Sequence, residues 1–450
     1  MPLISTFAAL SARGFGAGLS NPSYFGGTGY IGYQSHVIVD STIDSSGNSI
    51  FLLCDAGTLP TSSAIVSYIA SVTQYGALNF YKSISFLNSF QGICITVDSS
   101  NNILVGGQLS NTGYMAKFTN AGVFSWGKYY STLTFGDAVI SIAVDSGSNI
   151  YVGSNRQSNK GIILKHNSAG ANTSTMTLTG TSNVSAKKIV FDSFNNMYVS
   201  YGLGLTLASP TAYRRLGTGV TCIDASGNTV YTYNPTTNSG TRYGNYVEDI
   251  VTESSTQNLY ILQKSYNSVS YPTVNAIVVT VTKLSSTGAV LWSREKSITA
   301  TTASLITGSI TLDPTGNVYI TFANSAANQT YLVKFDSSGN TIWYNEVDIN
   351  NNTVYTPPNG LEWFNSRITL SGGGDIENFP DSGKVPISGS YINSTRTYHY
   401  APTFNTSFTS VTVPTTAFSM TTASTAGQGT ASSFNVVDVT NTYSLLQIGA

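Results

Sequence analysis

Apolar and polar residues alternate with a period of two along most of the chain, in short runs separated by turn residues. In the run SITLDPTGNVYITF, which covers residues 309–322, Ile310 and Leu312 fall on one face and Thr311 on the other. The alternation resumes after the turn, from Val318 onward. A period of two is the signature of β-strands. The run therefore predicts a β-hairpin.

The same hairpin recurs along the chain with an acidic residue at its turn. Each copy begins with a run in which apolar and polar residues alternate. An Asp, two or three small or polar residues and an Asn follow, and then a second alternating run. Clear copies carry Asp98, Asp145, Asp192 and Asp313, and weaker relatives carry Asp44 and Glu253. We expect each Asp to form an Asx turn, in which its carboxylate accepts backbone N–H groups. Calcium binding is disfavoured, because no D-x-D-x-D-G run or second carboxylate cluster accompanies it.

A second hairpin follows most copies of the first. It begins at Lys117, Lys165, Cys222, Lys283 or Lys334. A glycine occupies its tight turn, where a positive φ costs glycine nothing: Gly122, Gly170, Gly227, Gly288 and Gly339. Four of the five second strands reach an aromatic residue: Trp126, Tyr231, Trp292 and Trp343.

One hairpin of each type makes four antiparallel strands, and this unit repeats. The turn acids Asp98, Asp145, Asp192, Glu253 and Asp313 are separated by 47, 47, 61 and 60 residues. Four-stranded repeats of about 40 to 50 residues are typical of propeller blades. The fold class is thus all-β, a β-propeller of about seven four-stranded blades over residues 29–412. We expect residues 366–412 to form the seventh blade, with Gly29 to Val39 as its missing strand.

Two segments lie outside this predicted propeller. Residues 1–28 are Gly-rich and are interpreted as an N-terminal arm. Residues 413–450 begin with a Ser/Thr/Ala/Gly tract, interpreted as a flexible linker, and end in the alternating run FNVVDVTNTYSLLQI, interpreted as a strand. Because an exposed apolar edge recruits another chain, that strand is expected to pair with a neighbouring subunit or with its own propeller.

Charge is scarce. Lys and Arg number 20 and Asp and Glu 21, which is 9% of the chain against about 25% in an ordinary soluble domain. With a net charge of −1 and no basic run, nucleic acid is not an expected partner. The sequence contains no run of 18 apolar residues, so it predicts no membrane-spanning helix. The N-terminus lacks the basic region of a signal peptide. The low charge fits blade turns built of Ser, Asn and Gly.

Catalytic motifs were sought and none stands out. No H-E-x-x-H, G-x-S-x-G or P-loop pattern occurs. His166 occupies a slot held elsewhere by Phe118 or Phe335, which predicts a core residue, and Cys54, Cys94 and Cys222 are expected to be buried. Acids late in the chain could form a glycosidase pair, but their place in loops and turns explains them better: Glu346, Asp348, Glu362, Asp375, Glu377 and Asp381. We therefore expect no enzyme activity, no metal and no cofactor.

Aromatic residues in or beside the predicted loops are the better binding candidates. Tyr and Trp rings stack on sugars and anchor protein interfaces. The candidates for glycan or partner contact are Tyr129, Tyr130, Tyr243, Tyr246, Tyr271, Trp363, Tyr398 and Tyr400.

Two resemblances follow from these motifs. The D-x-x-G-N-x-Y-V-x-G pattern, strongest from Asp313 to Tyr319, resembles the bacterial propeller repeats of the NHL or SBBP kind. The leader ISTFAALSARGFG, residues 4–16, is similar to short leaders of structural and fibre-like proteins of tailed bacteriophages. This second resemblance implies that Phe7, Arg13 and Phe15 help to dock an arm on other virion proteins.

The combined prediction is a virion structural protein of a tailed bacteriophage, fibre- or tail-associated, without a signal peptide and without membrane insertion. It would adhere to host surface polysaccharide through its propeller loops and form a homo-oligomer. Two alternatives stay open. One is a capsid decoration or neck protein without receptor binding, and the other is an extracellular bacterial propeller adhesin or polysaccharide-degrading enzyme.

Overall fold

The computed structural model describes residues 27–30 and 36–447, apart from gaps at 56–65, 74–77, 86–89, 110–111, 131–137, 155–159, 180–183, 204–218, 236–241, 268–275, 300–307, 325–328, 351–357, 373–374, 382–388, 392–393, 402–408, 411–418, 424–427, 432–434 and 439–443. Phe7, Arg13 and Phe15 of the predicted arm lie outside the described residues, as does Tyr271. Gly27 and Thr28, placed in the arm by the sequence, belong to a strand.

Six sheets each contain four consecutive antiparallel strands, as the repeats predict. Blade 1 contains β2 (His36–Ile43), β3 (Ser49–Asp55), β4 (Ser67–Val72) and β5 (Leu78–Ser85). Blade 2 contains β6 (Gln91–Val97), β7 (Ile103–Leu109), β8 (Thr112–Phe118) and β9 (Phe124–Tyr130). Blade 3 contains β10 (Val139–Val144), β11 (Ile150–Ser154), β12 (Lys160–His166) and β13 (Asn172–Thr179).

The next three blades follow the same order. Blade 4 contains β14 (Val184–Phe191), β15 (Met197–Leu203), β16 (Gly219–Ile223) and β17 (Thr229–Tyr233). Blade 5 contains β18 (Arg242–Glu253), β19 (Asn258–Asn267), β20 (Ala276–Leu284) and β21 (Val290–Thr299). Blade 6 contains β22 (Gly308–Leu312), β23 (Val318–Asn324), β24 (Gln329–Phe335) and β25 (Thr341–Asn350).

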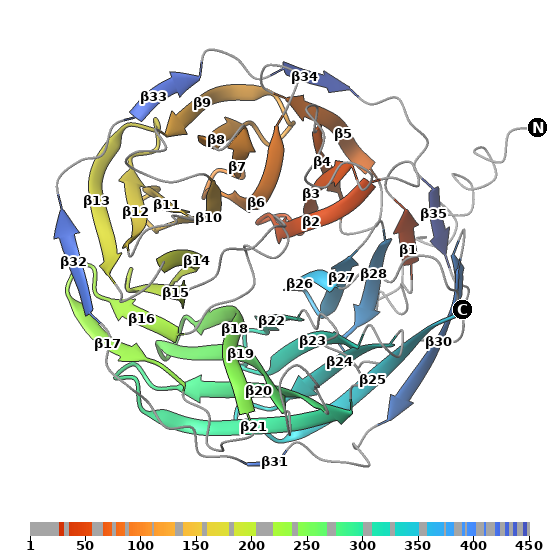
Figure 1. Cartoon of the computed structure of the whole chain (residues 1–450). Coiled ribbons are helices and arrows are strands. Elements are labelled where there is room, and N and C mark those ends of the chain that lie inside the picture. Colours follow the sequence, from red (N-terminus) through yellow and green to blue (C-terminus); the bar gives the residue numbers. More distant parts are fainter. Residues whose placement is uncertain are drawn as a thin grey trace, which may run out of the picture.

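A further sheet, blade 7, is assembled from three regions of the chain. Its consecutive strands are β26 (Pro358–Phe364), β27 (Arg367–Gly372) and β28 (Asp375–Pro380), and β1 (Gly27–Tyr30) pairs with β28 as the fourth. The innermost strands of the sheets touch in the cyclic order β2, β6, β10, β14, β18, β22 and β26, and β26 returns to β2 (Figure 1). The fold is therefore a closed β-propeller.

The structure corrects the count of uniform blades. Six blades, not seven, consist of four consecutive strands, because residues 366–412 do not form a blade of their own. Blade 7 starts earlier, at Pro358, and the predicted closing segment is divided: β1 closes blade 7, whereas residues from His36 onward open blade 1. Closure by an N-terminal strand was predicted, and its register, with Thr28 opposite Glu377, comes from the structure.

The C-terminal region forms a belt around the propeller, which we define as β30 to β35. β29 (Gly389–Tyr391) and β30 (Ser394–Ala401) extend blade 6, and β31 (Thr409–Ser410) adds to β21 of blade 5. β32 (Ser419–Ala423), β33 (Gln428–Ala431) and β34 (Asn435–Asp438) add to blades 3, 2 and 1, and β35 (Ser444–Gln447) adds to β1. The belt visits the blades in reverse order along the rim (Figure 1).

The belt changes the interpretation of residues 413–450. The predicted linker contains β32 and β33, since backbone N–H and C=O groups on each outer strand offer a partner to any extended segment that passes. Within the described residues, the terminal run FNVVDVTNTYSLLQI pairs with the same propeller, through β34 and β35.

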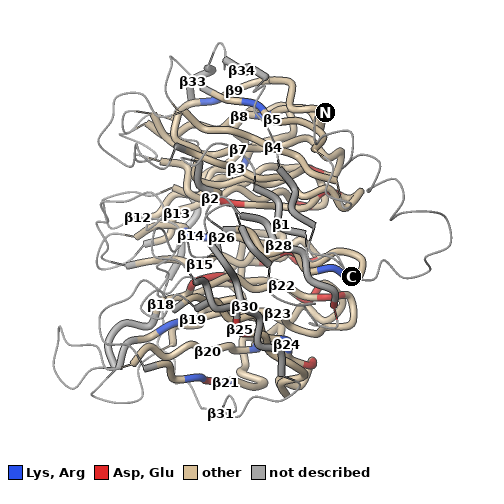
Figure 2. The backbone as a smooth tube through the Cα atoms, turned by 90° about the vertical axis from the view of Figure 1, so that its right-hand side faces the viewer, with Lys and Arg blue, Asp and Glu red and all other residues tan. Residues whose placement is uncertain are grey.

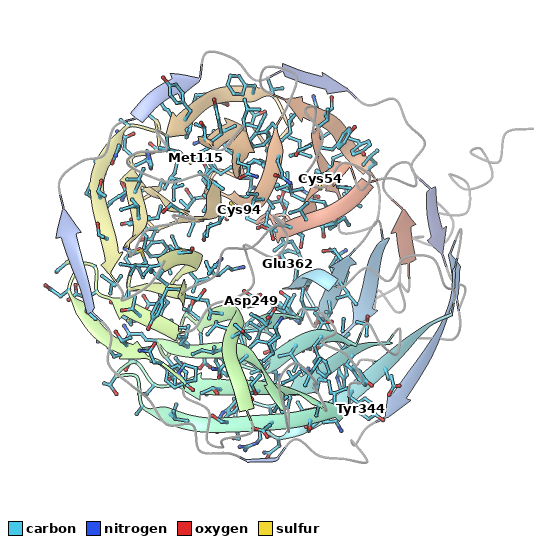
Figure 3. All side chains as sticks on the ribbon, in the orientation of Figure 1. Cys54, Cys94, Met115, Asp249, Tyr344 and Glu362 are labelled. Carbon is cyan, nitrogen blue, oxygen red and sulfur yellow. The ribbon has the colours of Figure 1, made fainter. Side chains whose placement is uncertain are left out.

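Neighbouring blades bury their apolar faces against each other. Ile50 and Leu52 of blade 1 share a core cluster with Ile103 and Val105 of blade 2. Because most sheets are covered on both faces, their strands are apolar on both sides, and Cys54, Cys94 and Cys222 lie in these layers as free, buried thiols (Figure 3 labels the first two). No described helix is long and apolar enough to cross a membrane.

Aromatic residues of the second hairpin join some blades to the next. Trp126 of blade 2 packs on the turn glycine Gly170 of blade 3, where an added Cβ would lie 3.0 Å from the indole. At the junction of blades 5 and 6, Trp292 covers Gly339 in the same way, and its Nε1 donates to the Ser337 carbonyl at 3.1 Å. All five predicted turn glycines have a positive φ. Gly170 and Gly339 are thus needed for close approach as well as for the turn.

Candidate functional site

The ring of inner strands surrounds a polar channel, and β-bulges shape it. Bulges or register shifts interrupt β2, β6, β10, β14, β18 and β26 near the same position. A bulge inserts one residue and re-aims its neighbour's side chain. Asp40 in β2 accepts the N–H of Ile95 in blade 2 at 2.8 Å, and Ser141 accepts the N–H of Ile189 in blade 4 at 3.0 Å. These bonds tie β2 to β6 and β10 to β14.

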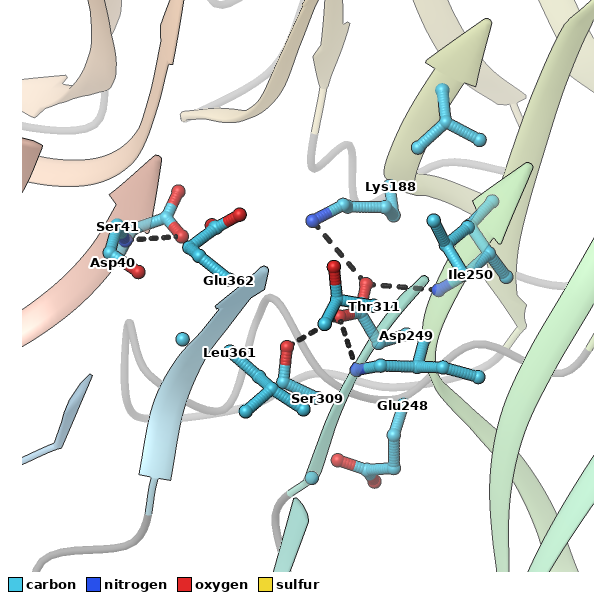
Figure 4. A pocket seen from close by; sticks show the side chains of 15 residues that line it. Asp40, Ser41, Lys188, Glu248, Asp249, Ile250, Ser309, Thr311, Leu361 and Glu362 are labelled. Carbon is cyan, nitrogen blue, oxygen red and sulfur yellow. Dashed lines mark hydrogen bonds and ion pairs between the residues drawn. The ribbon is translucent and has the colours of Figure 1, made fainter. Parts of the chain in front are cut away.

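A pocket opens on this channel where five inner strands converge (Figure 4). Its volume is about 170 Å³. Charged and hydroxyl side chains from β2, β14, β18, β22 and β26 line it: Asp40, Ser41, Lys188, Glu248, Asp249, Ser309, Thr311 and Glu362. In Figure 3, Asp249 and Glu362 lie at the centre of the ring, far from Tyr344 at the rim.

Asp249 is the most heavily bonded group in the pocket. One of its oxygens lies 3.3 Å from Lys188 Nζ and accepts the N–H of Ile250. The other accepts the Ser309 hydroxyl at 2.8 Å and the N–H of Ile310 at 3.2 Å. A carboxylate offers about four lone-pair sites, so these four donors saturate it. Asp249 therefore holds blades 4, 5 and 6 together.

Glu248, the bulge residue beside Asp249, forms a buried ion pair. Its Oε1 lies 2.6 Å from Lys264 Nζ, and both side chains are only 2% exposed. Asp40 and Glu362, on the neighbouring inner strands β2 and β26, border the same pocket (Figure 4). The open part of the pocket is thus bordered by Glu362, Asp40 and the hydroxyls of Ser41 and Thr311.

This set of groups suits a neutral polyhydroxylated ligand. Carboxylates accept hydrogen bonds from vicinal hydroxyls, and serine, threonine and lysine donate to ring or hydroxyl oxygens. Polar groups that converge on a pocket fix the orientation of a ligand and provide specificity. Within the described residues, no group of three or more His, Cys, Asp or Glu side chains is placed to hold a metal.

The Asx turns form as predicted and lie away from the channel pocket. In blade 6, Asp313 Oδ1 accepts the N–H groups of Thr315 at 2.9 Å and Asn317 at 3.0 Å. Burial alone would raise the pKa of Asp313, but the hydrogen bonds from Thr315 and Asn317 outweigh it and lower the pKa. Lys334 lies 3.8 Å from this carboxylate and 4.9 Å from the Tyr319 ring. In blade 6, the Asx turn is thus accompanied by a lysine from the same blade.

The predicted aromatic candidates differ in how far their side chains are exposed. Tyr129 lies in β9, is 40% exposed and packs beside Tyr114 with ring centroids 6.0 Å apart. Tyr246 in β18 is half-buried, and Trp363 in β26 is half-buried against the core of blades 6 and 7. Tyr243, Tyr398 and Tyr400 lie in strands β18 and β30, and their side chains are outside the described set.

The structure corrects the prediction that Tyr130 contacts a glycan or partner. It was expected near a loop, but it is fully buried in β9 and its hydroxyl lies 3.2 Å from His166 Nε2. Strand alternation turns Tyr129 outward and its neighbour Tyr130 inward. His166 is a core residue, as predicted.

The pocket residues Asp40, Lys188, Asp249 and Ser309 were missed by sequence reasoning. A signal was present: the charged pairs Lys187-Lys188 and Glu248-Asp249 interrupt apolar strands that open blades 4 and 5. Charge inside an otherwise apolar first strand indicates the channel, because the innermost strand of a propeller faces water.

No protein-family model matches the chain, and no curated protein matches it. Solved structures with a similar backbone include YCF48 bound to D1 peptide, at 9% identity and a TM-score of 0.48, covering 81% of this chain and 98% of that one. A protein from Lactobacillus plantarum has 10% identity and a TM-score of 0.42, covering 81% and 99%. Lignostilbene dioxygenase of Pseudomonas brassicacearum has 9% identity and a TM-score of 0.35, covering 71% and 88%. At such identities a likeness concerns the fold alone.

Proposed function

We propose that this protein is a non-enzymatic, glycan-binding propeller and a structural component, fibre- or tail-associated, of a tailed-bacteriophage particle. The channel pocket carries the binding part of the proposal, because charged and hydroxyl groups from five blades converge on a space of about 170 Å³. The leader over residues 4–16 supports the particle part, whereas the low charge belongs to the propeller blades. Figure 2 shows how thinly Lys, Arg, Asp and Glu are spread over the described chain.

Binding is favoured over chemistry by how the acids are used. Asp249 is saturated by four donors, and Asp40 already accepts the N–H groups of Ser41 and Ile95. Carboxylates that accept hydrogen bonds from backbone N–H groups of neighbouring blades stabilise the ring. Their role is then to hold the walls of the pocket in place rather than to act on a ligand as acid and base.

The binding experiment uses fragments of host surface polysaccharide and isothermal titration calorimetry. Glu362→Gln keeps the shape of the side chain and removes its charge, so we expect affinity to fall about tenfold, the loss of one charge-assisted hydrogen bond. Glu346→Gln, in the outer strand β25, is the matched control and should bind as the wild type does. Equal affinities for wild type and Glu362→Gln would remove the pocket from the proposal.

The particle experiment deletes residues 2–26, which stops short of β1. We expect the truncated protein to fold with an unchanged thermal midpoint and to be absent from purified particles, as measured by quantitative mass spectrometry. Electron microscopy of particles labelled at the C-terminus locates the wild-type protein on tail, neck or capsid. Full incorporation of the truncated protein would contradict the anchoring role.

A second candidate, polysaccharide cleavage, is favoured by one observation: Asp40 and Glu362 border the same pocket (Figure 4). Two carboxylates on either side of a glycosidic bond are the usual machinery for its hydrolysis. Release of reducing ends from the same polysaccharide separates the two candidates. Sustained release that Glu362→Gln abolishes would replace adhesion with hydrolysis.

A further inference from the structure

A second hollow lies between blades 5 and 6, at the rim of the propeller, where β21 is the outer strand of its blade (Figure 1). Its volume is about 530 Å³, within the range of roughly 300–1,000 Å³ that is usual for ligand sites. It shares no lining residue with the channel pocket. We call it the rim groove, and its lining includes Lys283, Leu291, Trp292, Arg294, Ser337 and Ser338.

Arg294 is held firmly in the rim groove. Its Nε donates to the Gly339 carbonyl at 2.8 Å, its Nη1 to the Ser293 carbonyl at 3.0 Å and its Nη2 to the Ser338 carbonyl at 3.0 Å. The central carbon of the guanidinium lies 5.5 Å from the centroid of the Trp292 ring. Because these contacts fix the side chain before a ligand arrives, binding to it costs little conformational entropy.

The guanidinium of Arg294 keeps hydrogen-bonding capacity after these contacts. A guanidinium carries five N–H donors, and the three carbonyls use one each on Nε, Nη1 and Nη2. One N–H on Nη1 and one on Nη2 have no hydrogen-bond partner among the described residues. Two such donors on one planar group suit the two oxygens of a carboxylate.

The charges around the rim groove favour an anion. The Lys283 ammonium donates to the Ser337 carbonyl at 3.3 Å and lies 3.4 Å from Glu253, which balances its charge. Asp336 lies in the same turn as Ser337, but its carboxylate accepts two backbone N–H groups of that turn and is not part of the lining. No described lining residue is acidic. A ligand in the groove therefore meets the positive charge of Arg294.

The other lining groups suit a sugar ring. Ser337 and Ser338 are exposed, and their hydroxyls can donate to or accept from sugar hydroxyls. Leu291 is 53% exposed, and together with Trp292 it supplies the apolar part of the groove. Amphipathic surfaces of this kind contact the C–H groups of a sugar while the polar groups bind its hydroxyls.

We propose that the rim groove binds an acidic sugar of the uronic acid class. The sugar carboxylate binds to the two remaining N–H donors of Arg294, and its hydroxyls bind to Ser337 and Ser338. This site is independent of the channel pocket, so either site can bind a ligand without the other.

The junction of blades 2 and 3 provides a matched comparison within the same chain. Trp126 and Lys128 hold the positions of Trp292 and Arg294, with the Lys128 ammonium 5.8 Å from the Trp126 ring. An ammonium group is a point charge and cannot bind both oxygens of a carboxylate as a guanidinium does. The exposed Ala169 holds the place of Ser338.

Isothermal titration calorimetry of the full chain with trigalacturonate and with its methyl ester tests the proposal. The two trisaccharides differ in the charge of their carboxyl groups, and wild type is expected to bind the acid about tenfold more tightly, the effect of one charge-assisted hydrogen-bonded pair. Ser338→Glu places a carboxylate in the groove and should abolish this preference. Ala169→Glu adds the same charge at the equivalent turn of blade 3 and should bind as the wild type does.

Arg294→Lys tests the guanidinium itself. This variant keeps the positive charge and loses the paired donors, so affinity for trigalacturonate should fall about fivefold while the ester is unaffected. The thermal midpoint of each variant checks that it folds.

Several outcomes overturn the proposal. Wild type may bind neither trisaccharide or both equally, and Ser338→Glu and Ala169→Glu may weaken binding by the same factor, which would be a general effect of charge. Loss of trigalacturonate binding in Glu362→Gln but not in Ser338→Glu would place the acidic sugar in the channel pocket. Tighter binding of a sulfated galactose trisaccharide would overturn the carboxylate assignment. Neutral polysaccharide fragments, titrated beside these ligands, report on the channel pocket separately.

Discussion

Blades 3 and 6 are built on the same repeat but differ at two positions that decide how they pack. Where blade 6 has Phe335 and Trp343, blade 3 has His166 and Ser174. Trp343 is buried and its Nε1 donates to the Asp381 carbonyl of blade 7 at 3.2 Å. Ser174 leaves the glycine of the next blade, Gly227, without a covering ring. The repeat thus sets the hairpin, while one variable position sets the strength of the junction.

The largest expected effect is a loss of stability at the junction of blades 5 and 6, where an aromatic ring covers the glycine of the next blade. Trp292→Ala removes the ring that covers Gly339 and the hydrogen bond to Ser337. The free energy of unfolding should fall by about 3 kcal/mol, near the lower end for removal of a packed Trp side chain, because Trp292 is half-buried. Urea denaturation measures it. Ser174→Ala, at the junction that is already open, should change stability by less than about 0.5 kcal/mol. Equal losses would mean that the junctions do not differ.

His166, the other position at which blade 3 differs from blade 6, predicts that the stability of the protein falls at acidic pH. Burial, helped by the nearby charge of Lys128, lowers the pKa of His166 from 6.5 to about 4. Between these values the unfolded chain binds a proton that the folded chain does not, so stability falls as pH drops below 6.5 and levels off near pH 4. The difference corresponds to about 3 kcal/mol.

His166→Phe, the residue found at this slot in blades 2 and 6, should remove that part of the pH dependence. Urea midpoints at pH 7, 5.5 and 4 measure it. Phe335→Leu in blade 6 is the control, which should shift stability by the same amount at every pH. An unchanged pH slope in His166→Phe would assign the acid sensitivity to other groups.

The smallest expected effect is a gain of stability at the junction of blades 3 and 4, where no ring covers Gly227. Ser174→Trp places an indole where blades 2 and 5 carry one, above Gly227. We expect a gain of about 1 kcal/mol, since an aromatic contact on a partly exposed surface adds little more. The thermal midpoint measures it. A loss of stability would show that the space above Gly227 is not shaped like that above Gly170 and Gly339.

The candidate site was less predictable than the repeats. Tyr129 and Tyr130 are adjacent and chemically identical, yet one is exposed and the other is buried, because strand register decides which faces solvent. Asp40 and Glu362 are distant in sequence and lie together only because the ring closes between β26 and β2. No local pattern marks such a pair.

The turns of this protein were determined by the sequence alone. Asp313 and Asn317, or a glycine with positive φ such as Gly339, act within five residues, so their geometry follows from local chemistry. Ring closure, the belt and the channel pocket were decided by tertiary structure. Thr28 pairs with Glu377, and Asp438 with Lys82. Backbone pairing of this kind depends on which edges remain open once the blades have formed, and almost any extended segment satisfies it.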